Sequence, residues 1–185
     1  MATLRDSFNY GASTEAPQPA RRHTLALLVE NEFGVLARIA GLLAGRGYNI
    51  ESLAVAETND PSLSRMTIMT SGTDHVIEQI IKQLRRLINV IKVSDLTELG
   101  YVDRELALIK VDASDGAKRD EILRVCVIFR ARVVDAGKNA FVLEATGDGG
   151  KIQSLIDMLE PLGIREIVRT GKIAIARGDR VLEAV

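Results

Sequence analysis

The residues of this 185-residue chain that are best suited to bind a small molecule form a short polar turn, Glu30 to Leu36. The turn lies between an apolar run, His23 to Val29, and a helix expected from Val35 to Arg46. The first N–H groups of a helix have no carbonyl partner within that helix, and the helix dipole favours an anion there. Gly34 lets a ligand approach the backbone closely, and the Asn31 amide can donate and accept hydrogen bonds. The turn is therefore predicted to recognise a small anion such as a carboxylate.

Glycine-rich segments elsewhere do not fit known cofactor motifs. Gly45-Arg46-Gly47 follows a helix and lacks the third glycine of a dinucleotide fingerprint. Gly149-Gly150-Lys151 is followed by Ile152 instead of Ser or Thr, so it is no phosphate-binding loop. Gly147-Asp148-Gly149 resembles the start of a thiamine diphosphate motif, but no asparagine follows Asn139 to complete it.

Catalytic and metal-binding constellations are not expected either. Cys126 falls on the apolar face of an expected helix, which indicates a core residue. His23 and His75 are far apart in sequence and lack a Cys or acidic cluster at ligand spacing. With no nucleophile and base in a recognisable pattern, we predict no catalytic residue and no metal site.

Composition excludes several classes of partner. The formal net charge is -1, from 24 Lys+Arg against 25 Asp+Glu, which gives no electrostatic reason to bind nucleic acid or an anionic membrane. No apolar run is long enough to span a membrane. A single cysteine fits a reducing compartment, so we expect a cytoplasmic protein. Residues 1–20 lack a signal-peptide pattern and are expected to form a flexible leader.

Hydrophobic periodicity predicts a β-α-β-β-α-β order over about residues 22–97. The expected strands are His23–Glu30, Tyr48–Thr58, Ser64–Ser71 and Val90–Leu96, and the expected helices are Val35–Arg46 and a segment from Val76 to Ile88 capped by Thr73. Both helices are amphipathic and can cover one face of a four-stranded antiparallel sheet, which is the ferredoxin-like arrangement. The other face of the sheet must then be solvated or covered by a partner.

The same order recurs after a polar junction, Gly100 to Asp103. The expected elements are a strand Arg104–Val111, a helix capped by Ser114 or Asp115, a hairpin of Arg132–Ala136 with Asn139–Ala145, a helix from Ile152 ended by Pro161 and Gly163, and one long or bent strand, Ile164–Arg177. The predicted fold class is therefore α+β, with two ferredoxin-like βαββαβ domains at residues 21–98 and 101–180. Each unit is small enough that oligomerisation would help to stabilise it.

Two specific stretches carry a resemblance to a known family. The run Asn31 to Leu36, together with Arg46-Gly47-Tyr48-Asn49-Ile50-Glu51-Ser52-Leu53, resembles an ACT domain. With Leu63-Ser64-Arg65-Met66-Thr67-Ile68 added, and with Arg104 to Lys110 and Arg177-Gly178-Asp179 further on, the chain is similar to the small regulatory subunits of acetolactate synthase (acetohydroxyacid synthase). The resemblance covers about residues 21–180.

The resemblance implies a regulatory protein without an active site. Such subunits activate a large catalytic subunit, which carries thiamine diphosphate, Mg²⁺ and FAD, and confer feedback inhibition by valine or another branched-chain amino acid. The ACT domains pair into a homodimer, and the effector lies at the interface of the pair. The matching effector-binding positions are Asn31, Phe33, Gly34, Val35, Leu36, Asn49 and Ile50. Relatives often have Ser or Pro where this chain has Phe33, whose bulk bears on which amino acid binds best.

Two other classes of function compete with this interpretation. One is an amino-acid-sensing ACT protein that regulates a different enzyme or a transcription factor, although no DNA-binding motif or basic patch is present. The other is a small ferredoxin-like enzyme, although no catalytic constellation is present.

Overall fold

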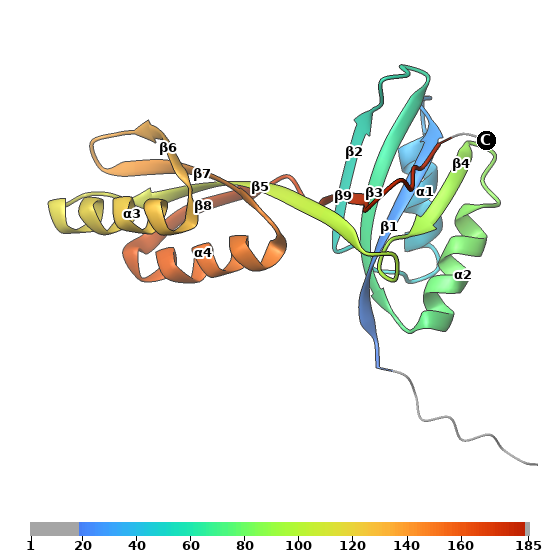
Figure 1. Ribbon diagram of the computed structural model, residues 1–185, viewed down its shortest axis with the longest axis horizontal. Helices are drawn as coiled ribbons and strands as arrows, with labels where there is room; N and C mark the ends of the chain where they lie inside the picture. Colours follow the sequence, from blue (N-terminus) through green and yellow to red (C-terminus); the bar gives the residue numbers. More distant parts are fainter. Residues whose placement is uncertain (1–18, 184–185) are drawn as a thin grey trace, which may run out of the picture.

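The computed structural model describes residues 19–183, so the expected leader, residues 1–20, lies almost wholly outside the described residues. Two antiparallel sheets, each with two helices packed on one face, lie at opposite ends of an elongated molecule (Figure 1). This arrangement confirms the predicted α+β class and the repeated ferredoxin-like order.

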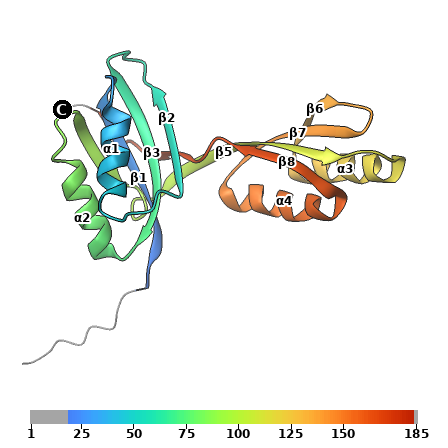
Figure 2. The same cartoon turned by 180° about the vertical axis from the view of Figure 1, so that it is seen from behind.

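The first unit consists of a four-stranded sheet and two helices that lie side by side on one face of it (Figure 2). Its elements are β1 (Arg21–Glu30), α1 (Val35–Ala44), β2 (Ser52–Glu57), β3 (Leu63–Gly72), α2 (Asp74–Leu84) and β4 (Val90–Asp95). The strand order β2-β3-β1-β4 places β2 at one edge and β1 in the interior.

The second unit repeats this topology, with strand order β6-β7-β5-β8. Its elements are β5 (Tyr101–Asp112), α3 (Gly116–Phe129), β6 (Arg132–Ala136), β7 (Ala140–Gly147), α4 (Gly149–Gly163), β8 (Ile164–Arg169) and β9 (Ile173–Ala176). The two units have separate aliphatic cores, but β9 packs against the first sheet, so the division into domains at residues 21–98 and 101–180 remains a proposal.

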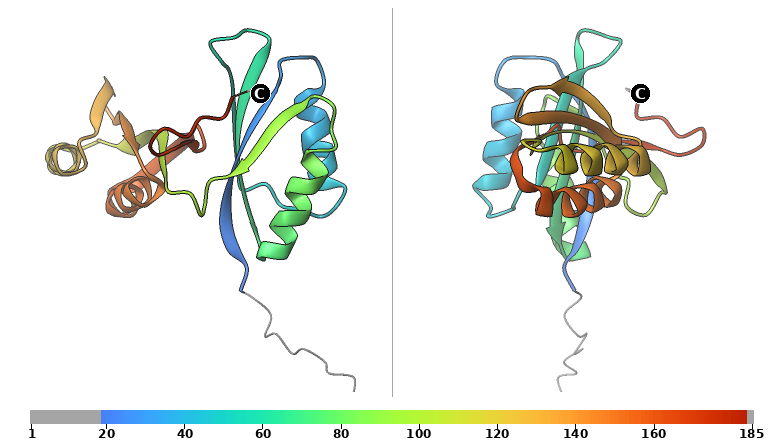
Figure 3. Two further views of the ribbon diagram at one scale, coloured as in Figure 1. Left: turned by 45° about the vertical axis from the view of Figure 1, so that its right-hand side comes forward. Right: turned by 90° about the vertical axis from the view of Figure 1, so that its left-hand side faces the viewer.

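Strand β1 is buried on both faces, which explains its nearly unbroken apolar sequence. Leu25 and Leu27 belong to the core under α1 and α2, whereas Ala26 belongs to a small second cluster with Leu96 and Ala174 of β9. The second face of the first sheet was expected to be solvated or covered by a partner. Instead, the same chain covers part of it, since the chain returns from the second unit along that side (Figure 3).

The strand β5 and the end of the chain differ from the prediction. Tyr101 to Asp103 were expected in a polar junction, but they begin β5 and pair with β9. The segment Ile164–Arg177 was expected as one strand. It forms two, β8 and β9, because the chain breaks at Gly171, whose φ of 79° no longer fits a strand.

Some element ends also differ from the prediction. Pro161 lies inside α4, which ends at Gly163 with a φ of 97°. Helix α2 ends at Leu84, and Ile88, which was placed on its apolar face, is exposed. The segment before Ser52 is irregular, so the second strand is shorter than expected.

Candidate functional site

The turn after β1 is held from one side by the loop before β3. The backbone N–H of Asn31 donates to the carbonyl of Ser62 over 2.7 Å, and its side-chain Nδ2 donates to the carbonyl of Pro61 over 2.9 Å. Asn31 is exposed, and its amide oxygen accepts from no described residue. Asn31 therefore anchors the turn and still offers an acceptor.

From the other side, the buried Asn89 holds the same turn. Its Nδ2 donates to the carboxylates of Glu30 over 2.6 Å and Glu32 over 3.3 Å, and its Oδ1 accepts from the guanidinium of Arg38. The backbone N–H of Glu30 donates to the carbonyl of Asn89 over 2.9 Å. Sequence reasoning missed Asn89, because an asparagine just before a strand gives no sign that it is buried against a distant turn.

Helix α1 begins differently from the other helices of the described chain. Thr73, Asp115 and Asp148 cap α2, α3 and α4 with side-chain oxygens, and Thr73 and Asp115 confirm the predicted caps. The residue before α1 is Gly34, which has no side chain, so it gives α1 no side-chain cap. Its φ is 82°, a conformation that suits glycine, and a Cβ built there would meet no atom within 4 Å. The N–H of Val35 makes only a long contact, 3.4 Å, with the carbonyl of Glu32, and the space beside Gly34 is open.

The apolar side chains of the turn divide into exposed and buried ones. Phe33 is fully exposed and Leu36 is 46% exposed, so both are available to a ligand. Val35 is 5% exposed and packs into the core of the first unit, so it can contribute only its backbone.

Asn49 and Ile50 lie at the other end of the sheet. The carbonyl of Asn49 accepts from Thr70 Oγ1 over 2.7 Å, whereas Asn31 is bonded to Ser62. From Ser62 to Thr70 is eight residues along β3, about 26 Å at the rise of an extended strand. Within one chain the structure therefore does not bring the two groups of candidate residues together.

Strand β2, at the edge of the sheet, connects these two ends. Ser52, at its start, pairs with Met69, and Glu57, at its end, pairs with Ser64, close to the Asn31 turn. If the β2 edges of two copies paired antiparallel, the start of β2 in one copy would lie beside the end of β2 in the other. Asn49 of one copy would then approach the Asn31 turn of the second copy.

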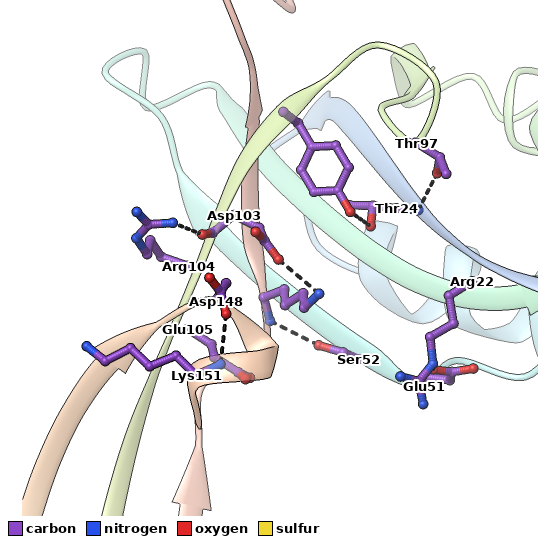
Figure 4. Close-up of polar contacts among 12 residues, drawn as sticks. Arg22, Thr24, Glu51, Ser52, Thr97, Asp103, Arg104, Glu105, Asp148 and Lys151 are labelled. Carbon is purple, nitrogen blue, oxygen red and sulfur yellow. Dashed lines mark hydrogen bonds and ion pairs between the residues drawn. The ribbon is translucent and has the colours of Figure 1, made fainter. Parts of the chain in front are cut away.

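A set of polar contacts joins the two units, and sequence reasoning missed it as well. The backbone N–H of Lys172 donates to Ser52 Oγ over 3.2 Å, and Lys172 Nζ lies 2.9 Å from Asp103 Oδ2 (Figure 4). Nearby, the buried carboxylate of Glu105 pairs with the guanidinium of Arg169. The contact at Ser52 links the segment after Asn49 and Ile50 directly to the second unit.

Residues 19–183 contain neither a membrane-spanning helix nor a cluster of metal ligands. No helix in this range is both long and apolar enough to cross a bilayer. No group of three or more His, Cys, Asp or Glu side chains in the same range is placed to hold a metal ion.

Comparison with known proteins gives consistent matches along the chain. Residues 25–92 match the family described as "AHAS small subunit-like ACT domain", and residues 104–178 match the family described as "Small subunit of acetolactate synthase". The chain is 55% identical over 163 residues to the acetolactate synthase small subunit of Aquifex aeolicus, covering 88% of this chain and 85% of that protein. It is 49% identical over 160 residues to the corresponding protein of Mycobacterium bovis, covering 86% and 95%.

A solved structure agrees with these sequence matches. The crystal structure of the acetolactate synthase small subunit from Thermotoga maritima matches with a TM-score of 0.80 at 39% identity. The match covers 86% of this chain and 99% of that one.

Proposed function

The chain belongs to the family of acetolactate synthase small subunits, which are regulatory and non-catalytic, and we propose that it confers feedback inhibition by valine on a large catalytic subunit. The observation that carries the effector part of this proposal is the uncapped start of α1 at Gly34, in a turn that Asn31 and Asn89 hold from both sides. A carboxylate is the natural group to fill that position.

The proposed contacts follow from the chemistry of an amino-acid zwitterion. Backbone N–H groups from Gly34 to Leu36 would bind the carboxylate. The side-chain oxygens of Asn31 and Asn49 would accept from the ammonium, and Leu36 and Ile50 would line the slot for the aliphatic side chain. One methylene in such a slot is worth only about 1–3 kcal/mol, so discrimination between valine and leucine should be modest.

Each effector would be bound by two copies of the chain. The distance along β3 separates the Asn31 turn from Asn49 within one copy, and antiparallel pairing of β2 edges would bring them together between two copies. Val55 on β2 is 43% exposed, which supports β2 as a surface to be covered. We therefore propose a homodimer through the ACT domains.

The large catalytic subunit is the proposed main partner. It would supply the chemistry with thiamine diphosphate, Mg²⁺ and FAD, and this chain would alter its activity. For valine to regulate the complex, it must bind one conformational state of the complex more tightly than the other. The coupling free energy between an effector site and a distant site is typically about 1–3 kcal/mol. A cytoplasmic location remains our expectation, based on the single cysteine.

Mixed dimers test the two-copy site. Homodimers of Gly34→Asp and of Asn49→Ala should both bind valine weakly. A dimer that combines one chain of each should regain one normal site, since both substitutions then fall on the other site. Calorimetry on the mixed dimer should give about one high-affinity valine per dimer. If the mixed dimer regains none, each site belongs to a single chain and the proposed site is wrong.

The regulatory role is tested by adding the chain to a large subunit. We expect higher acetolactate synthesis in its presence and inhibition by valine only in its presence. Activity that is unchanged by the chain would contradict the regulatory proposal, whatever the valine-binding result.

A further inference from the structure

A groove with a volume of about 460 Å³ lies on the face of the first sheet that is turned away from α1 and α2. Its floor is formed by β3 and β4, and its walls by β9 and the chain that follows to residue 183. Most of the lining is apolar, with Leu96, Leu99 and Leu182 among the contributing side chains. Three cations, Arg65, Lys92 and Arg180, also line it.

The guanidinium of Arg65 is only partly satisfied. Its Nη2 donates to the carbonyl of Ala174 in β9 over 3.2 Å. Its Nε is fully enclosed and has no hydrogen-bond partner, and its Nη1 donates to no described residue. Burial lowers the pKa of Arg65, which means that its surroundings disfavour the charge.

The other two cations add to this unbalanced charge. Leu28 of β1 pairs with Arg65 on one side and with Lys92 on the other, so the two cations flank one buried leucine across the sheet. Lys92 Nζ reaches the carbonyl of Glu183 over 3.4 Å. Within residues 19–183, none of the three cations forms an ion pair with a carboxylate.

At the junction between the two units, two other cations each form an ion pair with a carboxylate. Arg169 pairs with Glu105, and Lys172 pairs with Asp103. Proteins rarely bury a cation without an anion nearby, because desolvation then has no compensation. Among residues 19–183, Arg65 pairs with no carboxylate, and the one acidic residue of the lining, Glu183, is exposed, so an anion that binds in the groove would balance this charge.

We propose that this groove binds a small monocarboxylate with an aliphatic tail. The volume is within the usual range for small-molecule sites, about 300–1,000 Å³. The guanidinium would bind the carboxylate with charge-assisted hydrogen bonds, and the leucines would cover the tail. A zwitterion fits poorly, because the lining contains one acidic residue, the exposed Glu183, to balance an ammonium. A phosphate dianion fits poorly against apolar walls.

A matched pair of ligands tests the chemistry of the groove. 4-Methylpentanoate has the carbon skeleton of leucine without the ammonium, and it would be titrated into the full chain by calorimetry beside leucine and inorganic phosphate. We expect saturable binding of 4-methylpentanoate that survives Gly34→Asp, which removes the proposed effector site. Arg65→Gln should weaken this binding by about 10-fold or more, the range for a lost charge-assisted contact.

Two further variants change exposed side chains, so their effect on binding can be measured in folded protein. Arg180→Gln alters an exposed side chain and should weaken binding of 4-methylpentanoate without lowering stability. Arg86→Gln removes an exposed cation outside the groove and should change nothing. The proposal is wrong if 4-methylpentanoate does not saturate, if phosphate binds as tightly, or if folded Arg65→Gln and Arg180→Gln proteins bind like the original chain. Loss of binding in Gly34→Asp would also overturn it, since the ligand would then occupy the effector site.

Discussion

Replacing Gly34 by Asp should abolish most valine binding, and the structure separates the two reasons. Gly34 has a φ of 82°. A side chain in that conformation costs about 1–2 kcal/mol of folding free energy, which should lower the melting temperature by a few degrees in a chain of this size. The second effect is electrostatic, since no atom within 4 Å would keep the new carboxylate away from the space in front of α1.

The electrostatic effect can be isolated with Gly34→Asn, which has nearly the same shape as Gly34→Asp and no charge. Two carboxylates about 4 Å apart repel by about 1 kcal/mol in water and by about 4 kcal/mol at an effective dielectric constant of 20. Calorimetry should therefore show about 5-fold to several-hundred-fold weaker valine binding for Asp than for Asn. The difference should shrink as salt is added, because salt screens exposed charges.

Gly100→Asp provides the control. Gly100 also has a positive φ, 61°, and also has open space around its Cβ position, but it lies between β4 and β5. It should lose similar stability and keep its valine affinity. Equal valine affinity in Gly34→Asn and Gly34→Asp, or an equal loss in Gly100→Asp, would refute the placement of the effector carboxylate.

Three further predictions concern other parts of the molecule. Asn89→Ala should weaken valine binding by about 10-fold in calorimetry, because the turn after β1 loses the hydrogen bonds from Asn89 to Glu30 and Glu32. Hydrogen bonds from Lys118 and Arg165 hold the pKa of Asp112 at about 2, below the ordinary aspartate pKa of 3.8, so the native state favours the ionised carboxylate. Urea unfolding should show Asp112→Asn less stable than the original chain above about pH 4, with the difference lost as pH falls through about 2. Gly171→Ala should lower the melting temperature, since its Cβ would lie 2.6 Å from a serine hydroxyl of β2.

Each of these has its own control. Gly178→Ala has a positive φ and open space, so it should destabilise less than Gly171→Ala, and an equal effect would contradict the close contact. A stability difference for Asp112→Asn that persists at pH 1.5 would mean that packing, and not charge, explains it. Unchanged valine affinity in folded Asn89→Ala would show that the turn needs no buried support.

The sequence was sufficient for the fold because local signals agreed with the global topology. The helices lie where amphipathic segments were predicted, and Thr73 and Asp115 cap α2 and α3 as expected. The ends of the elements were predicted less well where distant contacts decide them. Tyr101 reads as a junction residue by composition, yet β9 recruits it into a strand. Pro161 reads as a helix end, yet α4 continues past it by two residues to Gly163.

The candidate site was predictable only in part. Gly34 and Asn31 could be found because they are close in sequence and resemble a known motif. The separation of Asn49 from them could not be found, since it depends on which end of β3 each one contacts. The same limit applies to Arg65, whose missing counter-charge becomes visible only when the strands are assembled.

The continuity of β5 has a mechanical consequence. Its first four residues pair with β9 beside the first sheet, and the rest forms the centre of the second sheet. A 12-residue strand is about 40 Å long, so tilting it by about 5° would displace its far end by about 3 Å. Paired spin labels on β2 and on α3 should report such a swing when valine is added, and an unchanged distance distribution would show that β5 does not act as a lever. If β5 does act as a lever, a small displacement at the proposed effector site would become a larger displacement of any partner bound to the second unit.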